Sequence, residues 1–125
     1  MPEVAADKLS VEAATLTKAT IRAAQELGIN NRVLAAILGL SESTVSRMSK
    51  GEYHLERGGK AFELGILFVR LYRSLDAIVS GDQKVAKNWM NNKNTVWRDA
   101  PINVVQNVTG LVNVIQYLDS RRARI

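Results

Sequence analysis

The stretch AAILGLSESTVSRMSKG, residues 35–51, decides how the fold of this chain is interpreted. An apolar helical segment stops at Gly39, and a run of small hydroxyl residues follows it. Two helices that cross at about 90–120° through a short turn need a small residue at their contact and a residue in the turn that accepts a positive φ. Ala35 and Gly39 have the required spacing. The apolar residues expected to hold both helices against a core are Leu34, Leu38, Leu40, Val45 and Met48. The pattern predicts a helix-turn-helix.

The second helix of this motif, with Ser41 as its N-cap, would present a polar face to a DNA groove. Short hydroxyl side chains allow close approach to base edges and phosphates. Arg47 can bond a guanine through two N–H groups, and Lys50 suits a phosphate. The predicted DNA-binding residues are Glu42, Ser43, Thr44, Ser46, Arg47 and Lys50. The alternative is a helical corner with a solvated polar face, and this face lacks the Asn and Gln that usually read adenine.

The composition favours an all-α protein. The chain has 125 residues, of which 46% are hydrophobic, with two prolines and no cysteine. Helix formers predominate, so we predict about seven helices and no strands. Without cysteine the chain offers no disulfide and no thiolate metal ligand. The N-terminus has no signal pattern and no apolar run is suited to span a bilayer, so we expect a soluble, cytoplasmic protein without membrane contact.

Hydrophobic periodicity and turn residues divide the chain. We predict a flexible N-terminus at residues 1–8, a helix-turn-helix domain at 9–57 and a second helical domain at 60–125, joined by a polar, glycine-rich connector. The segment 61–79 is apolar over most of its surface, which predicts the central helix of the second domain. The residues expected to form the buried faces of the following helices are Val85, Ala86, Trp89 and Met90, then Ile102, Val105 and Val108, and finally Leu111, Val114, Ile115 and Leu118.

The net charge of +5 favours a polyanionic partner only weakly. Residues 1–60 contain eight Lys and Arg against seven Asp and Glu, whereas residues 61–125 contain nine against five. The basic total therefore does not mark the first half as the DNA-binding part, and that prediction depends on the helix-turn-helix pattern.

The second half contains a more specific succession of residues, Trp89, Asn94, Pro101 and Gly110. It resembles the C-terminal toxin-binding domain of the Xre/MbcA/ParS-type antitoxins, and the first half resembles the Xre-like helix-turn-helix that precedes this domain. The resemblance covers about residues 9–120. It implies an antitoxin of a type II toxin–antitoxin system. Such a protein blocks the active site of a RES-type toxin that degrades NAD⁺, or of a related ADP-ribosylating toxin, and represses the shared operon.

The resemblance places the toxin-binding surface on the last three helices and the C-terminal tail. Trp97 lies in a polar loop and is our candidate for an exposed anchor. Asn92 and Asn94 belong to the same loop, although both could simply build its turn. Trp89 is instead expected in the core. Pro101 and Gly110 are expected to start a helix and to permit a close helix contact.

The basic tail is the other part of the predicted toxin-binding surface. We hypothesise that it approaches the NAD pocket of the toxin, where guanidinium groups would pair with acidic residues or occupy phosphate sites. The tail residues concerned are Arg121, Arg122, Arg124 and Ile125. The alternative is a solvated basic tail without a partner.

No set of residues suggests an enzyme. His54 is the only histidine, and with Glu52 and Glu56 in a loop it makes a poor metal site. The pair Gly58-Gly59 follows no predicted strand and precedes no Lys-Ser or Lys-Thr pair, so it is not a phosphate-binding loop. We therefore expect no catalysis, no metal and no cofactor.

Three functions remain open at this point. The first is an antitoxin that binds its toxin and operator DNA, as a homodimer within a larger toxin–antitoxin complex. The second is a stand-alone helix-turn-helix repressor whose C-terminal half only dimerises it. The third is a toxin inhibitor that does not bind DNA.

Overall fold

The computed structural model describes residues 2–122, with side chains described from Ser10 onward. This part of the chain contains seven helices and no strand, apart from a single β-bridge between Asn94 and Asp99. The helices are α1 (Pro2–Glu26), α2 (Asn31–Leu38), α3 (Glu42–Ser49), α4 (Lys60–Ile78), α5 (Gln83–Asn91), α6 (Pro101–Val104) and α7 (Val108–Arg122). The all-α prediction is confirmed. Among the described residues, no helix is both long and apolar enough to cross a membrane.

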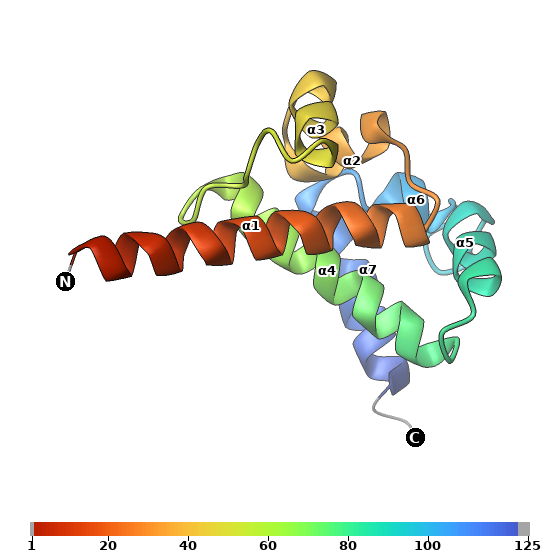
Figure 1. Cartoon of the computed structure of the whole chain (residues 1–125). Coiled ribbons are helices and arrows are strands. Elements are labelled where there is room, and N and C mark those ends of the chain that lie inside the picture. The colour runs from red at the N-terminus through yellow and green to blue at the C-terminus, as the bar shows by residue number, and fades with distance from the viewer. Residues whose placement is uncertain (1, 123–125) are drawn as a thin grey trace.

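The apolar helix α4 is the centre of the whole fold, whereas the sequence predicted it as the central helix of the second domain alone. It packs against α1, α2, α5 and α7, and Figure 1 shows α1 crossing it while α7 runs beside it. Phe68, Leu71 and Leu75 are buried on α4, whereas Glu63 and Arg70 are exposed. Buried residues from α1–α5 and α7 form one hydrophobic cluster. The helix-turn-helix and the helices that follow it therefore share a core.

The connector between α3 and α4 is fixed to α1 by an apolar and a polar contact. Leu55 is fully buried, and its backbone N–H donates to the Thr17 hydroxyl at 2.8 Å. Gly65 on α4 permits this arrangement, because a Cβ there would lie 3.0 Å from Leu55 Cδ1 and 3.2 Å from Thr20 Oγ1. The connector therefore lies against the core instead of being a free linker.

Two of the predicted apolar faces are rotated from their expected positions. In α5 the buried residues are Ala86 and Met90, while Val85 is 47% exposed and Trp89 is only half-buried. The prediction of Val85 as a buried residue is wrong, whereas Trp89 is partly buried and packs against the core. Ala86 and Met90, one turn apart, lie at the middle of the contact, so Val85 on the adjacent side of the helix turns outward and Trp89 lies at the edge of the core.

Val108 is also exposed, to 57%, although the sequence predicts it in the core. It is the first residue of α7, and the buried stripe of this helix begins at Gly110. Gly110 itself confirms the prediction of a close helix contact, because a Cβ there would lie 1.8 Å from the Val104 carbonyl oxygen. Pro101 occupies the start of α6 and is buried, as expected.

Candidate functional site

The turn between α2 and α3 has the geometry that the sequence predicts. Gly39 ends α2 in the left-handed region, with φ 68° and ψ 33°. The next backbone N–H, that of Leu40, donates to the Ala35 carbonyl at 3.0 Å. A Cβ on Gly39 would meet no atom within 4 Å, so the turn needs glycine for its φ angle and not for space. Ala35 is buried at the contact.

The helix α3 starts with a local hydrogen-bond network. The Ser41 hydroxyl accepts from the Thr44 backbone N–H at 3.1 Å and bonds the Thr44 hydroxyl at 2.8 Å. It also lies 3.2 Å from the Ser43 hydroxyl. Val45 and Met48 are buried on the opposite side of the helix. The cap and these two anchors fix which face of α3 is turned to solvent.

The predicted DNA-binding residues all lie at the surface of this helix and its C-cap. Glu42, Ser43, Arg47 and Lys50 are exposed. Thr44 and Ser46 are half-buried. The arrangement offers a polar, accessible face that a DNA groove can receive.

Arg47 lies against its own domain. Its guanidinium carbon is 5.7 Å from the centre of the Tyr53 ring, and it donates to the Glu52 carbonyl at 3.5 Å. Such a cation–π contact at an exposed site is weak, so Arg47 can exchange it for a base. No local pattern in the sequence marks Tyr53, because the contact joins the end of α3 to the connector.

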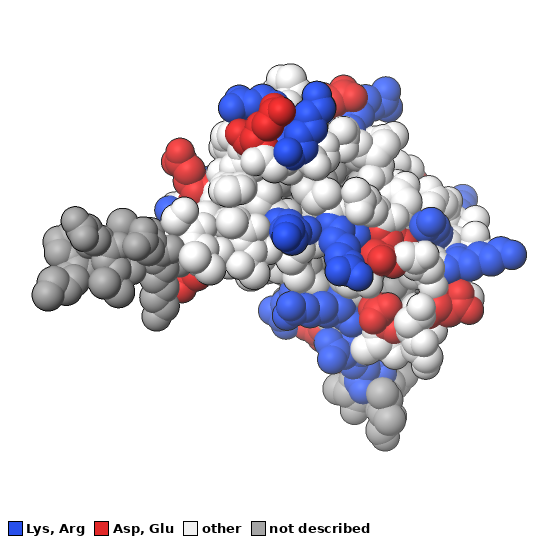
Figure 2. Space-filling view, viewed as in Figure 1, with Lys and Arg blue, Asp and Glu red and all other residues white. Residues whose placement is uncertain are grey.

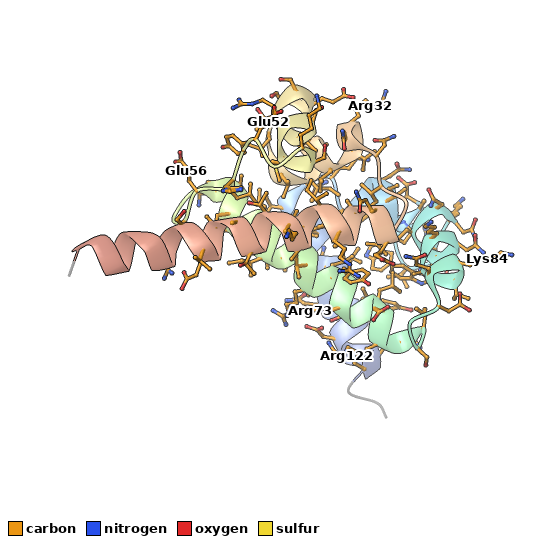
Figure 3. All side chains as sticks on the ribbon, viewed as in Figure 1. Arg32, Glu52, Glu56, Arg73, Lys84 and Arg122 are labelled. Atoms are coloured by element: carbon orange, nitrogen blue, oxygen red, sulfur yellow. The ribbon has the colours of Figure 1, made fainter. Side chains whose placement is uncertain are left out.

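Arg32 is a further exposed cation at this end of the molecule, near the start of α2, and Figure 3 shows it on the same end as Glu52. The Asn30 side chain caps α2 by accepting from the Val33 backbone N–H at 2.9 Å. A cation beside a helix N-terminus suits a phosphate, since the free backbone N–H groups favour an anion there. Arg32 was not among the DNA-binding residues predicted from the sequence.

Three aromatic rings meet on the surface of the second half. We call Trp89, Trp97 and Tyr117 the aromatic cluster. The ring centres of Trp97 and Tyr117 are 5.1 Å apart, and those of Trp89 and Tyr117 are 6.5 Å apart in a stacked arrangement. Each ring is half-buried. Trp97 is therefore held by two other rings and is less exposed than its polar loop suggested.

Arg121 joins this cluster. Its guanidinium carbon lies 4.9 Å from the Tyr117 ring centre, and an Nη2 group donates to the Tyr117 hydroxyl at 2.9 Å. The structure thus brings together Trp97 and Arg121, two of the predicted toxin-binding residues. Tyr117 was missed, and the available signal was its position four residues before Arg121, which places both side chains on one face of a helix.

The two predicted asparagines have different environments. Asn94 builds the turn: its backbone N–H donates to the Asp99 carbonyl at 3.0 Å, and its side chain accepts from the Val96 backbone N–H at 2.9 Å. Asn92 ends α5 and is exposed. Hydrogen bonds from Asn103 and the Ala100 backbone hold the pKa of the Asp99 carboxyl below its ordinary value. The turn that carries Trp97 is therefore bonded at both ends.

Arg122 points toward α4 and not toward the aromatic cluster. It donates to the Ser74 hydroxyl at 3.1 Å, and Ser74 in turn donates to Asp119 at 2.7 Å. Arg70 forms an ion pair with the same carboxylate. Burial alone would raise the pKa of Asp119, but the bonds from Ser74 and Arg70 and the nearby arginine charges outweigh it, so the pKa is lowered. Arg124 and Ile125 lie outside the described residues.

His54, the only histidine in the sequence, is exposed. His54 lies in the connector, and within the part of the chain that the structure describes no three His, Cys, Asp or Glu side chains gather as a metal site would require.

Two family matches cover most of the chain. Residues 8–70 match the antitoxin Xre-like helix-turn-helix domain, and residues 74–124 match the antitoxin Xre/MbcA/ParS C-terminal toxin-binding domain. The matches meet within α4, and the division of the chain at 57–60 stays a prediction. A comparison with curated proteins gave no match. The α2–α3 corner and the aromatic cluster lie one in each matched region. The resemblance inferred from the sequence is thus confirmed, and the chain belongs to the Xre-like helix-turn-helix antitoxins and carries their toxin-binding domain.

Proposed function

We propose that this antitoxin neutralises a RES-type toxin that degrades NAD⁺, or a related ADP-ribosylating toxin, by covering its active site. The observation that carries the proposal is the meeting of Trp97, Tyr117 and Arg121 at one surface of the toxin-binding domain. Tryptophan, tyrosine and arginine are the residue types that most often dominate binding energy at protein interfaces. The stand-alone repressor with a C-terminal dimerisation half does not account for the match to a toxin-binding domain.

The aromatic cluster is suited to act as a preformed anchor. The ring contacts and the bonded turn at Asn94 limit the motion of Trp97, so little side-chain entropy is lost on binding. A cavity of about 240 Å³ lies beside the cluster. Its lining is mostly apolar and consists of Leu75, Ile78, Val79, Trp89, Tyr117, Leu118 and Arg121. An apolar side chain of the toxin would fit between the rings and this lining.

The C-terminal tail would complete the contact. Arg121 and Arg122 form the last turn of α7, and Arg124 and Ile125 follow them in the sequence. Once the toxin is docked on the aromatic cluster, the tail would be held close to the toxin surface, so its effective concentration there would be high. We propose that the tail guanidinium groups enter the NAD pocket and pair there with carboxylates or fill phosphate positions, Arg122 exchanging its bond to the Ser74 hydroxyl for one to the toxin.

We further propose that the protein represses its own operon as a homodimer, with α3 in the major groove. Glu42, Ser43, Thr44, Ser46 and Arg47 would face base edges or the adjacent backbone, while Lys50 and Arg32 would contact phosphates. Two copies are required because helix-turn-helix proteins usually bind paired half-sites. The proposal places the protein in the cytoplasm with its operator and assigns it no catalytic step, cofactor or metal.

The test is complex formation with the product of the adjacent gene. The wild-type chain is expected to co-purify with that protein and to suppress its NAD⁺ consumption. Trp97→Ala should weaken the complex by at least about 2 kcal/mol if Trp97 is a central anchor. Val96→Ala is the matched control, because Val96 is an exposed apolar residue in the same turn. Equal neutralisation by both variants, with unchanged circular dichroism, would refute the anchor. A wild-type chain that leaves NAD⁺ consumption unchanged would refute the proposed activity.

A further inference from the structure

A groove of about 580 Å³ lies between α1 and α4 and shares no residue with α3 or with the aromatic cluster. Its apolar lining consists of Val11, Leu16, Ala19, Ile66 and Val69. Val11 is 64% exposed and Ile66 is 48% exposed, so this lining is accessible from solvent. Apolar side chains that gather in one groove, in contrast to scattered ones, indicate a binding surface.

The two ends of the groove differ in polarity. α1 and α4 run in the same general direction along it (Figure 1). The lining residues that come first in each helix, Val11 and Ile66, therefore lie toward one end. Arg70 and Arg73 come later in α4, and they line the other end together with Arg122 from the last turn of α7. One end of the groove is thus apolar and the other end is basic.

Positive charge at the basic end is only partly neutralised. Figure 3 shows Arg73 and Arg122 on the same side of the molecule below α1, and Figure 2 shows Lys and Arg side chains gathered over this face. The nearby carboxylate of Asp119 is already paired with Arg70. Within the described part of the chain, Arg73 forms no ion pair. Glu12, the acidic residue of the lining, is paired with an arginine of the connector. The basic end can therefore receive an anion.

The dimensions of the groove suit a small molecule. From Val11 to Ala19 the apolar lining extends for about 12 Å along α1, or about two helical turns. The volume of the groove lies within the range of about 300–1,000 Å³ that is usual for ligand pockets. A stable protein interface buries more than about 1,000 Å² and would extend well beyond two helical turns. The groove by itself therefore fits a small molecule with an apolar and an anionic end.

We propose that the groove binds a single-chain carboxylate, such as a fatty acid of medium length. The acyl chain lies over Val11 and Ile66, and the carboxylate accepts two N–H groups from Arg73. A guanidinium group has five N–H donors, so Arg122 can keep its bond to the Ser74 hydroxyl and still donate to the carboxylate. The site is separate from the toxin and DNA surfaces of the proposed function and does not depend on either partner.

The first test is isothermal titration calorimetry of the full-length chain with decanoate, at concentrations below those at which decanoate forms micelles. Decanoate is expected to bind saturably. Dodecanoate should bind more tightly and octanoate more weakly, by about threefold to tenfold for every two carbons, because the acyl chain is buried in a half-open groove. Decanol has the same chain without the charge, and it should bind at least about tenfold more weakly than decanoate.

Tryptophan fluorescence shows which cavity the ligand occupies. The chain contains two tryptophans, and both belong to the aromatic cluster, which lies beside a separate apolar cavity. Decanoate in the α1–α4 groove should leave the tryptophan emission unchanged. A change in emission that saturates with the calorimetric Kd would place the ligand at the aromatic cluster and overturn the inference.

Four variants separate the roles of charge and apolar contact. Arg73→Gln should weaken decanoate binding at least about tenfold and leave decanol binding unchanged. Lys84→Gln is its control, because Lys84 is an exposed cation on α5 outside the groove. Ile66→Asn should weaken the binding of both ligands. Its control is Val108→Asn, at an exposed apolar position outside the groove, which should weaken neither. Circular dichroism shows whether each variant is folded.

Three results would each overturn the inference: no saturable binding to the wild-type chain, equal affinities for decanoate and decanol, or an undiminished affinity of Arg73→Gln for decanoate. Sedimentation velocity of the same samples tests whether protein covers the groove instead. A lower mass for Ile66→Asn, together with no binding of decanoate to the wild type, would assign the groove to a second copy of the chain. Since every measurement is made without toxin or DNA, failure here is distinct from failure of neutralisation.

Discussion

Arg121 lies over the ring of Tyr117, with its guanidinium carbon 4.9 Å from the ring centre and one N–H donated to the hydroxyl at 2.9 Å. This pair links α7 to Trp97, since the Trp97 and Tyr117 ring centres are 5.1 Å apart. The loop between α5 and α6 and the last turns of α7 thus form one continuous surface in the toxin-binding domain.

Tyr117→Ala is expected to weaken the toxin complex more than Tyr117→Phe. The alanine variant removes the ring on which Trp97 and Arg121 rest, at a cost of about 2 kcal/mol or more for a central anchor. The phenylalanine variant loses only one exposed hydrogen bond, with a cost of about 0.5–1.5 kcal/mol. Titration calorimetry with the purified toxin measures both. Equal affinities for the two variants would show that the ring does not contribute to binding.

Shortening the tail tests whether it reaches the toxin's active site. Deleting residues 121–125 removes all three tail arginines, and with them the Arg121 contact on Tyr117 and the Arg122 bond to Ser74, and is expected to reduce inhibition of NAD⁺ consumption. Replacing Arg121, Arg122 and Arg124 with lysine keeps the charge but removes the two-pronged bonds that guanidinium forms with carboxylate or phosphate. Full neutralisation by the shortened chain would show that the tail is a solvated end.

Gly110→Ala and Gly39→Ala should destabilise the protein for different reasons. A Cβ at position 110 would lie 1.8 Å from the Val104 carbonyl oxygen, so α6 and α7 must separate, and we expect a loss of at least about 3 kcal/mol. At position 39 there is open space, and the cost is the positive φ alone, about 1–2 kcal/mol. Urea denaturation measures both free energies of unfolding. A larger loss for Gly39→Ala would contradict this assignment.

Asp119 should make stability depend on pH at the acidic end. Its pKa is lowered in the folded state, so its contribution is complete above the unfolded pKa, about 3.9, and is lost as the pH falls through the lower folded pKa. Urea denaturation at neutral pH and at pH values below this window measures how far the free energies of unfolding of the wild type and of Asp119→Asn differ. We expect this difference in free energy to shrink on acidification. Ser74→Ala removes one bond to the carboxylate, so its loss of stability at neutral pH should lie between zero and that of Asp119→Asn. A pH-independent difference would contradict the prediction.

Arg47→Ala should reduce specific operator binding by about 1–3 kcal/mol if Arg47 bonds a guanine through two N–H groups. Arg32→Ala should instead weaken binding to operator and unrelated duplex alike. It should also reduce the slope of log affinity against log salt concentration by about one, as expected for the loss of a phosphate contact. Fluorescence anisotropy at several salt concentrations separates the two effects. Unchanged operator affinity in Arg47→Ala would exclude it from base recognition.

The local features of the fold could be predicted from the sequence. The corner at Gly39, the cap at Ser41 and the start of α6 at Pro101 depend on residues within a few positions of one another. Their signals are backbone angles and short-range hydrogen bonds, which neighbouring residue types determine directly. The predicted recognition face of α3 follows from the same local periodicity.

The functional surfaces depended on contacts between distant segments. Tyr117 meets Trp97, and Arg122 meets Ser74, only because α7 packs along α4 and beside the loop after α5. Periodicity placed Val85 in the core, yet the orientation of α5 is set by what Ala86 and Met90 contact. The sequence by itself therefore determined the helices, the turn and the helix-turn-helix. Only the tertiary structure decided which side chains share a surface, because each helix buries the part of its apolar face that a partner covers.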